Sequence, residues 1–198
     1  ADVIFGEAGD DTLNGDGGFD SIDGGDGNDV VFAGADNDTV SGGLGNDTIN
    51  GQAGNDSING DDGDDVINGQ TGQDTLNGNG GNDIVNGNAG NDLIDGGAGD
   101  DAVYGGGGND QLQGSDGLDT LRGNSGDDTI FGGGGADCIF GDAGNDLVFG
   151  GQAQVDITAV ATVNPEGNAG SRLVSLIVSR TTDIGGAASV DFATVNGS

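Results

Sequence analysis

Aspartate recurs at every ninth residue through most of this chain, from Asp11 to Asp146. Carboxylates can take part in acid–base catalysis, or their oxygens can bind a cation. The sequence has no histidine and a single cysteine, Cys138, so it offers neither a histidine-assisted nucleophile nor a nitrogen and sulfur metal cluster. Carboxylate and backbone carbonyl oxygens suit calcium, whereas magnesium keeps its waters and demands strict octahedral geometry. The pattern therefore predicts repeated calcium binding rather than catalysis.

These aspartates occupy the sixth position of a nine-residue unit, which runs sixteen times without a gap from residue 6 to residue 149. The eighth position is always Leu, Ile or Val. The first and fourth positions are Gly in every unit but one, which carries Ala33 and Asp36. Asp2 and Ile4 are in register as the tail of a preceding unit, although Asp2 lacks its own turn. The predicted side-chain ligands are Asp11, Asp20, Asp29, Asp38, Asp47, Asp56, Asp65, Asp74, Asp83, Asp92, Asp101, Asp110, Asp119, Asp128, Asp137 and Asp146.

Each unit predicts a turn followed by a short strand. Glycines at the first and fourth positions permit positive φ, so the first six residues are expected to form a tight turn. Positions seven to nine are rich in Thr, Ser and aliphatic residues, which predicts a strand whose eighth side chain points inward. Repetition then builds a coil of parallel strands around a thin apolar seam. Asp36 is expected to take the turn conformation in place of Gly, and we predict the weakest calcium sites there.

The overall composition, taken by itself, is typical of a disordered chain. It includes 47 Gly and 35 acidic residues, and the formal net charge is −32. One aliphatic side chain in nine residues is a thin core, so bound cations must relieve the repulsion between stacked carboxylates. Arg122, Arg172 and Arg180 are the whole basic inventory, which argues against nucleic acid and anionic membranes as partners. No apolar run approaches the ~20 residues of a membrane span.

The unit resembles the RTX nonapeptide, GGxGxDxUx, over about three quarters of the chain. This resemblance implies an all-β fold, a parallel β-roll (a β-solenoid) of two nonapeptides per turn, over residues 1–151. It also implies Ca²⁺ between turns stacked on the same side, at about fourteen sites, which would neutralise nearly all the charge of the repeats. The implied ligands are the sixth-position carboxylates and turn carbonyls, the latter from Gly42, Gly51, Gly60, Gly69, Gly78, Gly87, Gly96 and Gly105.

Ninth-position side chains are expected to form outward ladders, because units two apart lie on the same sheet. Asn50, Asn68 and Asn86 would share one sheet and Asn59 and Asn77 the other, either hydrogen-bonded along the ladder or simply solvated. Aromatic residues take this position near the end of the repeats. Phe131 and Phe149 are predicted to stack on one sheet, and Phe140 lies on the other; they would contact the following domain or a separate partner. Cys138 is expected to be a small, inert outward residue.

The repeats stop after Phe149, and residues 152–198 are rich in Val, Ala, Thr and Ser. Strands are predicted at 155–163, 172–180 and 187–195, separated by turn signals. Residues 163–167, 173–180 and 190–197 resemble the opening half of a Calx-β domain. This resemblance implies a partial antiparallel β-sandwich in which Glu166 is a calcium ligand. Its open edge would be completed by further chain or by a neighbouring copy through strand addition.

Three functions fit these features, and none of them gives this piece an enzyme activity of its own. The resemblance implies a calcium-binding structural module of a large secreted or cell-surface bacterial protein, of adhesin, surface-layer or matrix type. Such a module would be exported by type I secretion and would fold on extracellular calcium. The alternatives are the carrier module of a secreted protease, lipase or epimerase, and a homo-oligomeric filament subunit. Because the chain begins within a unit, we expect it to be a piece of a longer polypeptide.

Overall fold

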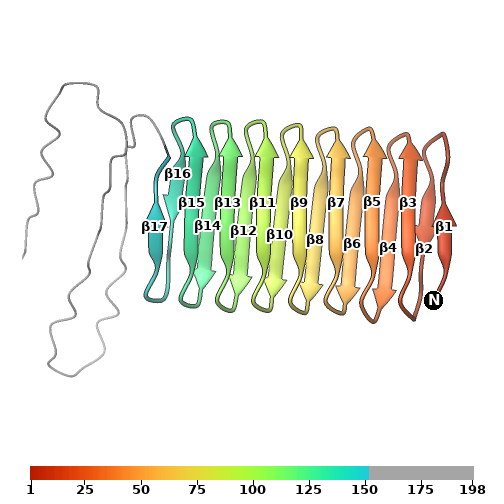
Figure 1. Ribbon diagram of the computed structural model, residues 1–198, viewed down its shortest axis with the longest axis horizontal. Coiled ribbons are helices and arrows are strands. Elements are labelled where there is room, and N and C mark those ends of the chain that lie inside the picture. The colour runs from red at the N-terminus through yellow and green to blue at the C-terminus, as the bar shows by residue number, and fades with distance from the viewer. Residues whose placement is uncertain (152–198) are drawn as a thin grey trace, which may run out of the picture.

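The computed structural model describes residues 1–151, which form a solenoid of two parallel β-sheets (Figure 1). The nine odd-numbered strands make one sheet, here called the odd sheet, and the eight even-numbered strands make the even sheet. The chain therefore changes sheet at every strand, and two units make one turn. The predicted all-β roll is confirmed. Within residues 1–151, no helix has the length and apolar character needed to cross a membrane.

Thirteen of the strands are six residues long, and the two at each end are shorter. In chain order they are β1 (Val3–Phe5), β2 (Thr12–Asn14), β3 (Ser21–Asp26), β4 (Val30–Ala35), β5 (Thr39–Leu44), β6 (Thr48–Ala53), β7 (Ser57–Asp62), β8 (Val66–Thr71), β9 (Thr75–Gly80), β10 (Ile84–Ala89), β11 (Leu93–Ala98), β12 (Ala102–Gly107), β13 (Gln111–Asp116), β14 (Thr120–Ser125), β15 (Thr129–Gly134), β16 (Cys138–Phe140) and β17 (Leu147–Phe149).

The strands are longer than predicted, because each continues through the third position of the next unit. In β6, Ile49 and Gly51 are both buried and their neighbours are partly or fully exposed. The two inward residues are the eighth position of one unit and the first of the next, so the period of two persists across the unit boundary. The turn is confined to the fourth, fifth and sixth positions.

Stacking is by 18 residues, so that each side chain lies beside its equivalent two units later. Ile49 pairs with Ile67, and Asn50 pairs with Asn68. The eighth-position side chains form the predicted apolar seam, which is fully buried from Val31 to Ile130 apart from 1% exposure at Leu112. Equivalent strands stacked in two facing sheets bury the seam between them without any other element covering it.

The turn geometry corrects one prediction about glycine. First-position glycines do not have positive φ; the second and fourth positions do, as at Gln52 (φ 74°) and Gly54 (φ 152°). The first position excludes a side chain for another reason, since a Cβ on Gly69 would lie 2.3 Å from Oδ2 of Asp74. Asp36 has φ 78°, so it takes the left-handed conformation as predicted.

The outward ladders are confirmed at both sheets. The Asn77 side-chain amide donates to Oδ1 of Asn59 at 3.0 Å in the odd sheet, and Asn86 donates to Oδ1 of Asn68 at 3.2 Å in the even sheet. Further along, the rings of Phe131 and Phe149 stack, with centroids 4.8 Å apart and planes 6° apart. Side chains on the outer faces therefore repeat with the backbone.

At the end of the even sheet, the guanidinium carbon of Arg122 lies 4.6 Å from the centroid of the Phe140 ring. Cys138 is exposed, as predicted. The predicted Calx-β-like segment, including Glu166, lies outside the described residues.

Candidate calcium-binding site

The sixth-position aspartates lie at the two edges of the roll, each immediately before a strand. Every second aspartate lies on the same edge, because consecutive turns alternate between the passage from even to odd sheet and the return passage. The fourteen from Asp20 to Asp137 are buried, with at most 6% of each residue exposed. The predicted ligand side chains therefore form two continuous columns of buried carboxylates.

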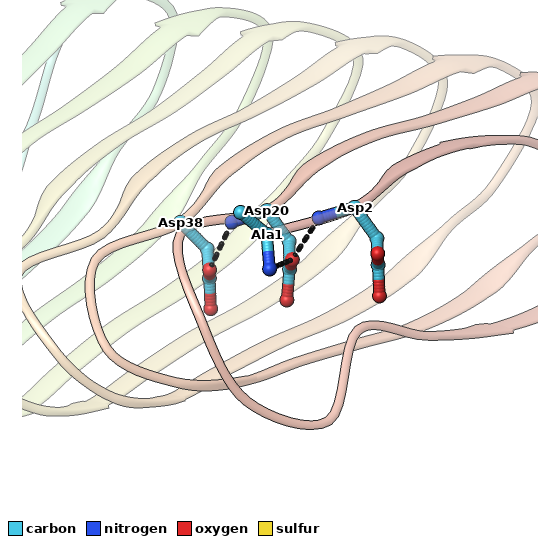
Figure 2. A network of polar contacts seen from close by, with 4 residues as sticks. All are labelled: Ala1, Asp2, Asp20 and Asp38. Carbon is cyan, nitrogen blue, oxygen red and sulfur yellow. Dashed lines mark hydrogen bonds and ion pairs between the residues drawn. The ribbon is translucent and has the colours of Figure 1, made fainter.

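From Asp20 to Asp146, one oxygen of each carboxylate accepts a backbone N–H from the preceding turn and so holds the two turns in register. Oδ1 of Asp74 accepts the backbone N–H of Asp56 at 2.9 Å, and Oδ1 of Asp92 accepts that of Asp74 at 2.9 Å. Figure 2 shows the same arrangement at the N-terminal end, where Asp2 donates to Asp20 and Asp20 donates to Asp38. These bonds fix the rotation of each carboxyl group and therefore the direction of its second oxygen.

The second oxygen is buried and lacks a hydrogen-bond partner in fifteen of these aspartates. A buried, unpaired carboxylate oxygen is costly, and native proteins seldom leave one unless a cation is bound. The residues that share this feature are Asp11, Asp20, Asp29, Asp38, Asp47, Asp56, Asp65, Asp74, Asp83, Asp92, Asp101, Asp110, Asp119, Asp128 and Asp137.

A backbone oxygen from the next turn lies close to Oδ2 of twelve of these fifteen carboxylates. A Cβ on Gly42 would lie 2.4 Å from Oδ2 of Asp47 and 2.6 Å from the carbonyl oxygen of Gly60. One charged and one neutral oxygen thus converge where a side chain would otherwise stand. Within residues 1–151 no three acidic, His or Cys side chains cluster around a metal position, so backbone carbonyls would have to complete each coordination shell. This donor set fits calcium, which takes six to eight oxygens in flexible geometry.

The eight glycines predicted as carbonyl ligands lie in strands, not in turns. They were expected in turns, but each lies inside a six-residue strand. Strand pairing runs through positions seven to nine and positions two and three, and it leaves out the first position, as between β8 and β10. A first-position carbonyl oxygen instead lies near the place that a Cβ would take on the equivalent glycine one turn earlier, as the oxygen of Gly87 lies 3.1 Å from that place on Gly69. The ligand role of these carbonyls stays a prediction. The residues are Gly42, Gly51, Gly60, Gly69, Gly78, Gly87, Gly96 and Gly105, in β5 to β12.

Without calcium, the buried carboxylates of the two columns tend to bind protons when the roll folds. Burial raises the pKa of Asp65 to about 7; the N–H from Asp47 opposes this shift and neighbouring carboxylates add to it. Burial likewise raises the pKa of Asp101 to about 7 and that of Asp74 to about 6. A cation that displaced these protons would remove both the desolvation cost and the mutual repulsion.

The described part of the chain supplies almost no positive charge for these columns. Arg122 is the one basic side chain in residues 1–151, and it pairs with Asp142, a second-position residue, at 3.2 Å. The ammonium group of Ala1 lies 3.4 Å from Oδ1 of Asp20 (Figure 2). The other carboxylates of the columns have no protein cation beside them within residues 1–151, so their counterions have to come from solution.

Comparison with known families agrees with this chemistry. The family model of the RTX calcium-binding nonapeptide repeat (4 copies) matches residues 1–22, 15–49, 41–76, 77–112 and 113–151. No curated protein matches the chain. The matched segments cover the whole roll and about three quarters of the sequence. The chain therefore belongs to the family of RTX calcium-binding nonapeptide-repeat proteins, whose repeats bind Ca²⁺.

Proposed function

We propose that residues 1–151 are a calcium-folded structural module of a larger secreted or cell-surface protein of adhesin, surface-layer or matrix type. Calcium is a component of this fold and not a regulator of it. The observation that carries the proposal is the set of fifteen buried Oδ2 atoms without a partner. An apolar seam of one side chain per unit cannot by itself offset so many buried charges.

Within this module, the sixth-position carboxylates and first-position carbonyls would hold the ions. Bound calcium supplies the positive charge that the chain lacks. The bond from each Asp N–H to the next Oδ1 holds the carboxylate so that Oδ2 faces the first-position glycine, as for Asp74 and Gly69. The absence of a Cβ at that glycine leaves room for the two oxygens to approach. The chain's own residues therefore pre-position the donors once two turns have stacked.

Coupling of folding to calcium suits export. Where free calcium is low, repulsion among 35 acidic residues opposes compaction and keeps the chain unfolded. Outside the cell, millimolar calcium binds the folded roll but has no preformed site in the unfolded chain. Binding free energy then becomes folding free energy. The carboxylates are accounted for by this role, so we propose no catalytic activity for the module.

The test is far-UV circular dichroism of the 198-residue chain during a calcium titration, with EGTA added at the end. We expect a disordered spectrum in EGTA, a cooperative change to β-structure on adding calcium, and reversal by EGTA. A magnesium titration is the control for simple screening of charge. A full β-spectrum that persists in EGTA at neutral pH would contradict the proposal.

A further inference from the structure

The two faces of the roll differ sharply in charge. The strands of the odd sheet contain six acidic residues, in β3, β7, β11 and β13. The eight strands of the even sheet contain none, and their single charged residue is Arg122 in β14. In a chain of net charge −32, the middle of this face, between the second-position residues Asp16 and Asp142 near its two ends, is thus without acidic side chains. Such a face avoids the repulsion that the rest of the surface imposes on a ligand or partner.

The middle of this neutral face is lined with amide side chains. On β6, β8 and β10 the ninth position is Asn50, Asn68 and Asn86, and the second position is Gln52, Gln70 and Asn88. A shallow hollow of about 520 Å³ lies over these strands, lined by Asn50, Asn68, Gln70, Thr71, Asn88 and Ala89. The hollow therefore presents both hydrogen-bond donors and acceptors, without charge.

Several of these amides have unused hydrogen-bonding capacity. The side chains of Gln52 and Gln70 make no hydrogen bond to another residue within 1–151, and Asn68 uses only its Oδ1, as an acceptor from Asn86. Gln52 and Gln70 also have φ of 74° and 75°, a conformation that Gly adopts freely and that Gln, unlike Asn or Asp, seldom does. At the equivalent second positions, the neighbouring strands β4 and β12 have Gly34 and Gly106. The glutamines thus occupy positions where the backbone itself favours glycine.

Charge and hydrogen bonding together restrict what this face can bind. An anionic ligand needs Lys or Arg and a cation needs carboxylates, and the face over β6, β8 and β10 has neither. Protein-binding hot spots rely on Trp, Tyr and Arg, which are missing from these three strands, although Tyr104 lies on the adjacent strand β12. Hydroxyl groups, which donate and accept, match the amides, and the partly exposed Val66 and Ile84 offer apolar contact for C–H groups.

The periodicity of the face indicates a periodic ligand. A pair of amide side chains recurs at the same two positions of β6, β8 and β10, and neighbouring strands lie ~4.8 Å apart. Next to Asn86 in this column stands Tyr104 of β12, whose ring could stack on a sugar. We propose that the outer face of the even sheet, centred on the hollow over β6, β8 and β10, binds a neutral linear polysaccharide. This proposal depends on the roll itself and not on the type of protein that carries it.

The experiment is native affinity electrophoresis of the calcium-loaded 198-residue chain in gels that contain dextran, a soluble β-glucan or a galactomannan. Polygalacturonate, an anionic polysaccharide, is the control. We expect at least one neutral polymer to retard the chain and polygalacturonate not to. Absence of retardation by all three neutral polymers would overturn the proposal.

A matched pair of double variants locates the binding face. Asn68→Ser/Asn86→Ser removes two ninth-position amides from the even sheet, and Asn59→Ser/Asn77→Ser removes the equivalent pair from the odd sheet. We expect the first pair to weaken binding about tenfold and the second to leave it unchanged, because only the first contacts the polymer. Equal losses in both variants would contradict the assignment.

Two further measurements distinguish loss of polysaccharide contacts from misfolding and from self-association. The variant Gln52→Gly/Gln70→Gly places glycine at two second positions of the even sheet, where the neighbouring strands already have Gly34 and Gly106, so we expect the fold to be preserved. We also expect this variant to bind the polysaccharide more weakly. Calcium-dependent circular dichroism of every variant reports folding independently. Sedimentation velocity tests whether a second copy of the chain binds this face. A dimer that the Asn68→Ser/Asn86→Ser variant dissociates, in a chain that binds no polysaccharide, would overturn the proposal and would show that the face is an interface between copies.

Discussion

Oδ1 of Asp92 accepts the backbone N–H of Asp74 at 2.9 Å, while Oδ2 of the same carboxylate is buried without a partner. The first oxygen ties two turns together, and the second leaves a charge that the protein does not neutralise. The same pair of roles, a hydrogen-bonded Oδ1 and an unpartnered Oδ2, recurs along both columns. It makes the stability of the roll depend on solution cations and on pH, in ways that can be measured separately.

Replacing Asp74 and Asp92 together by Asn should separate these two roles. The Asn side-chain carbonyl can still accept the inter-turn N–H bond, but the negative charge is lost. We expect isothermal titration calorimetry to count fewer calcium ions per chain, and the calcium-loaded roll to unfold at lower denaturant concentration. Asp116→Asn, at an exposed position of β13, is the control and should leave both quantities unchanged. Unaltered stoichiometry in the double variant would refute the ligand assignment.

The calcium-free roll should be most stable in acid. Buried Asp65 and Asp101 have pKa raised to about 7, and Asp74, Asp110 and Asp119 to about 6, from 3.8 in the unfolded chain. The folded form thus binds more protons than the unfolded form, so the free energy of unfolding falls as pH rises. The contribution is fully present below about pH 4 and is lost as pH rises through 6 to 7.

Circular dichroism in EGTA at a series of pH values checks this prediction, and β-structure should appear as pH falls toward 4. Calcium competes with the same protons, so its apparent affinity should fall as pH is lowered from 7 to 5, and binding should release protons. Calorimetry in buffers of different ionisation enthalpy measures that release. A calcium affinity that does not change with pH would contradict the picture of buried, proton-binding carboxylates.

Adding one methyl group at a first position should damage the site. A Cβ on Gly69 would lie 2.3 Å from Oδ2 of Asp74, so Gly69→Ala must displace the carboxylate. We expect the calcium concentration at the folding midpoint to rise and the roll to lose about 1–3 kcal/mol of stability, the usual cost of overpacking. Gly80→Ala is the control, since its Cβ would meet nothing closer than 3.7 Å. Similar midpoints for both variants would argue against crowding at the carboxylate.

The unit that contains Ala33 and Asp36 allows the reverse substitution, from a larger residue to glycine, to be tested. Ala33 carries the Cβ that other first positions exclude, and Asp36 has φ 78° where other units have Gly. Restoring glycine at both positions, with Ala33→Gly/Asp36→Gly, should remove crowding and backbone strain at this turn. We expect folding at a lower calcium concentration, measured by circular dichroism. A higher midpoint would mean that this unit is not the weak point of the columns.

Much of this architecture could be predicted because the position of a residue in the nine-residue unit determines its place in the roll. Asp74 and Ile49 could be assigned to the carboxylate column and the apolar seam from their places in a repeating unit. The stacking by 18 residues also explains why the Asn59 and Asn77 amides were expected to meet. Such predictions succeed because in a solenoid each unit contacts its neighbours in the same way throughout.

The backbone geometry at the first and second positions of the unit could not be predicted from the sequence. Gly51 looked like a turn residue, yet it lies in β6 and is kept small by Asp56, whose Oδ2 would lie 2.5 Å from its Cβ. Positive φ at Gln52 was also unforeseen, because Gln gives no local signal for that conformation. The frequent Gly, Asn and Asp at the second position were the available clue, since these residues best tolerate positive φ.

The most direct measurement of the central claim is a crystal structure of the calcium-loaded chain, with the ions located by anomalous scattering. We predict ions along both edges of the roll, each bonded at about 2.3–2.6 Å to Oδ2 of a sixth-position aspartate such as Asp74 or Asp92, with backbone carbonyls completing the shell. Ions found only on the outer faces, with these Oδ2 atoms still unpartnered, would contradict the account.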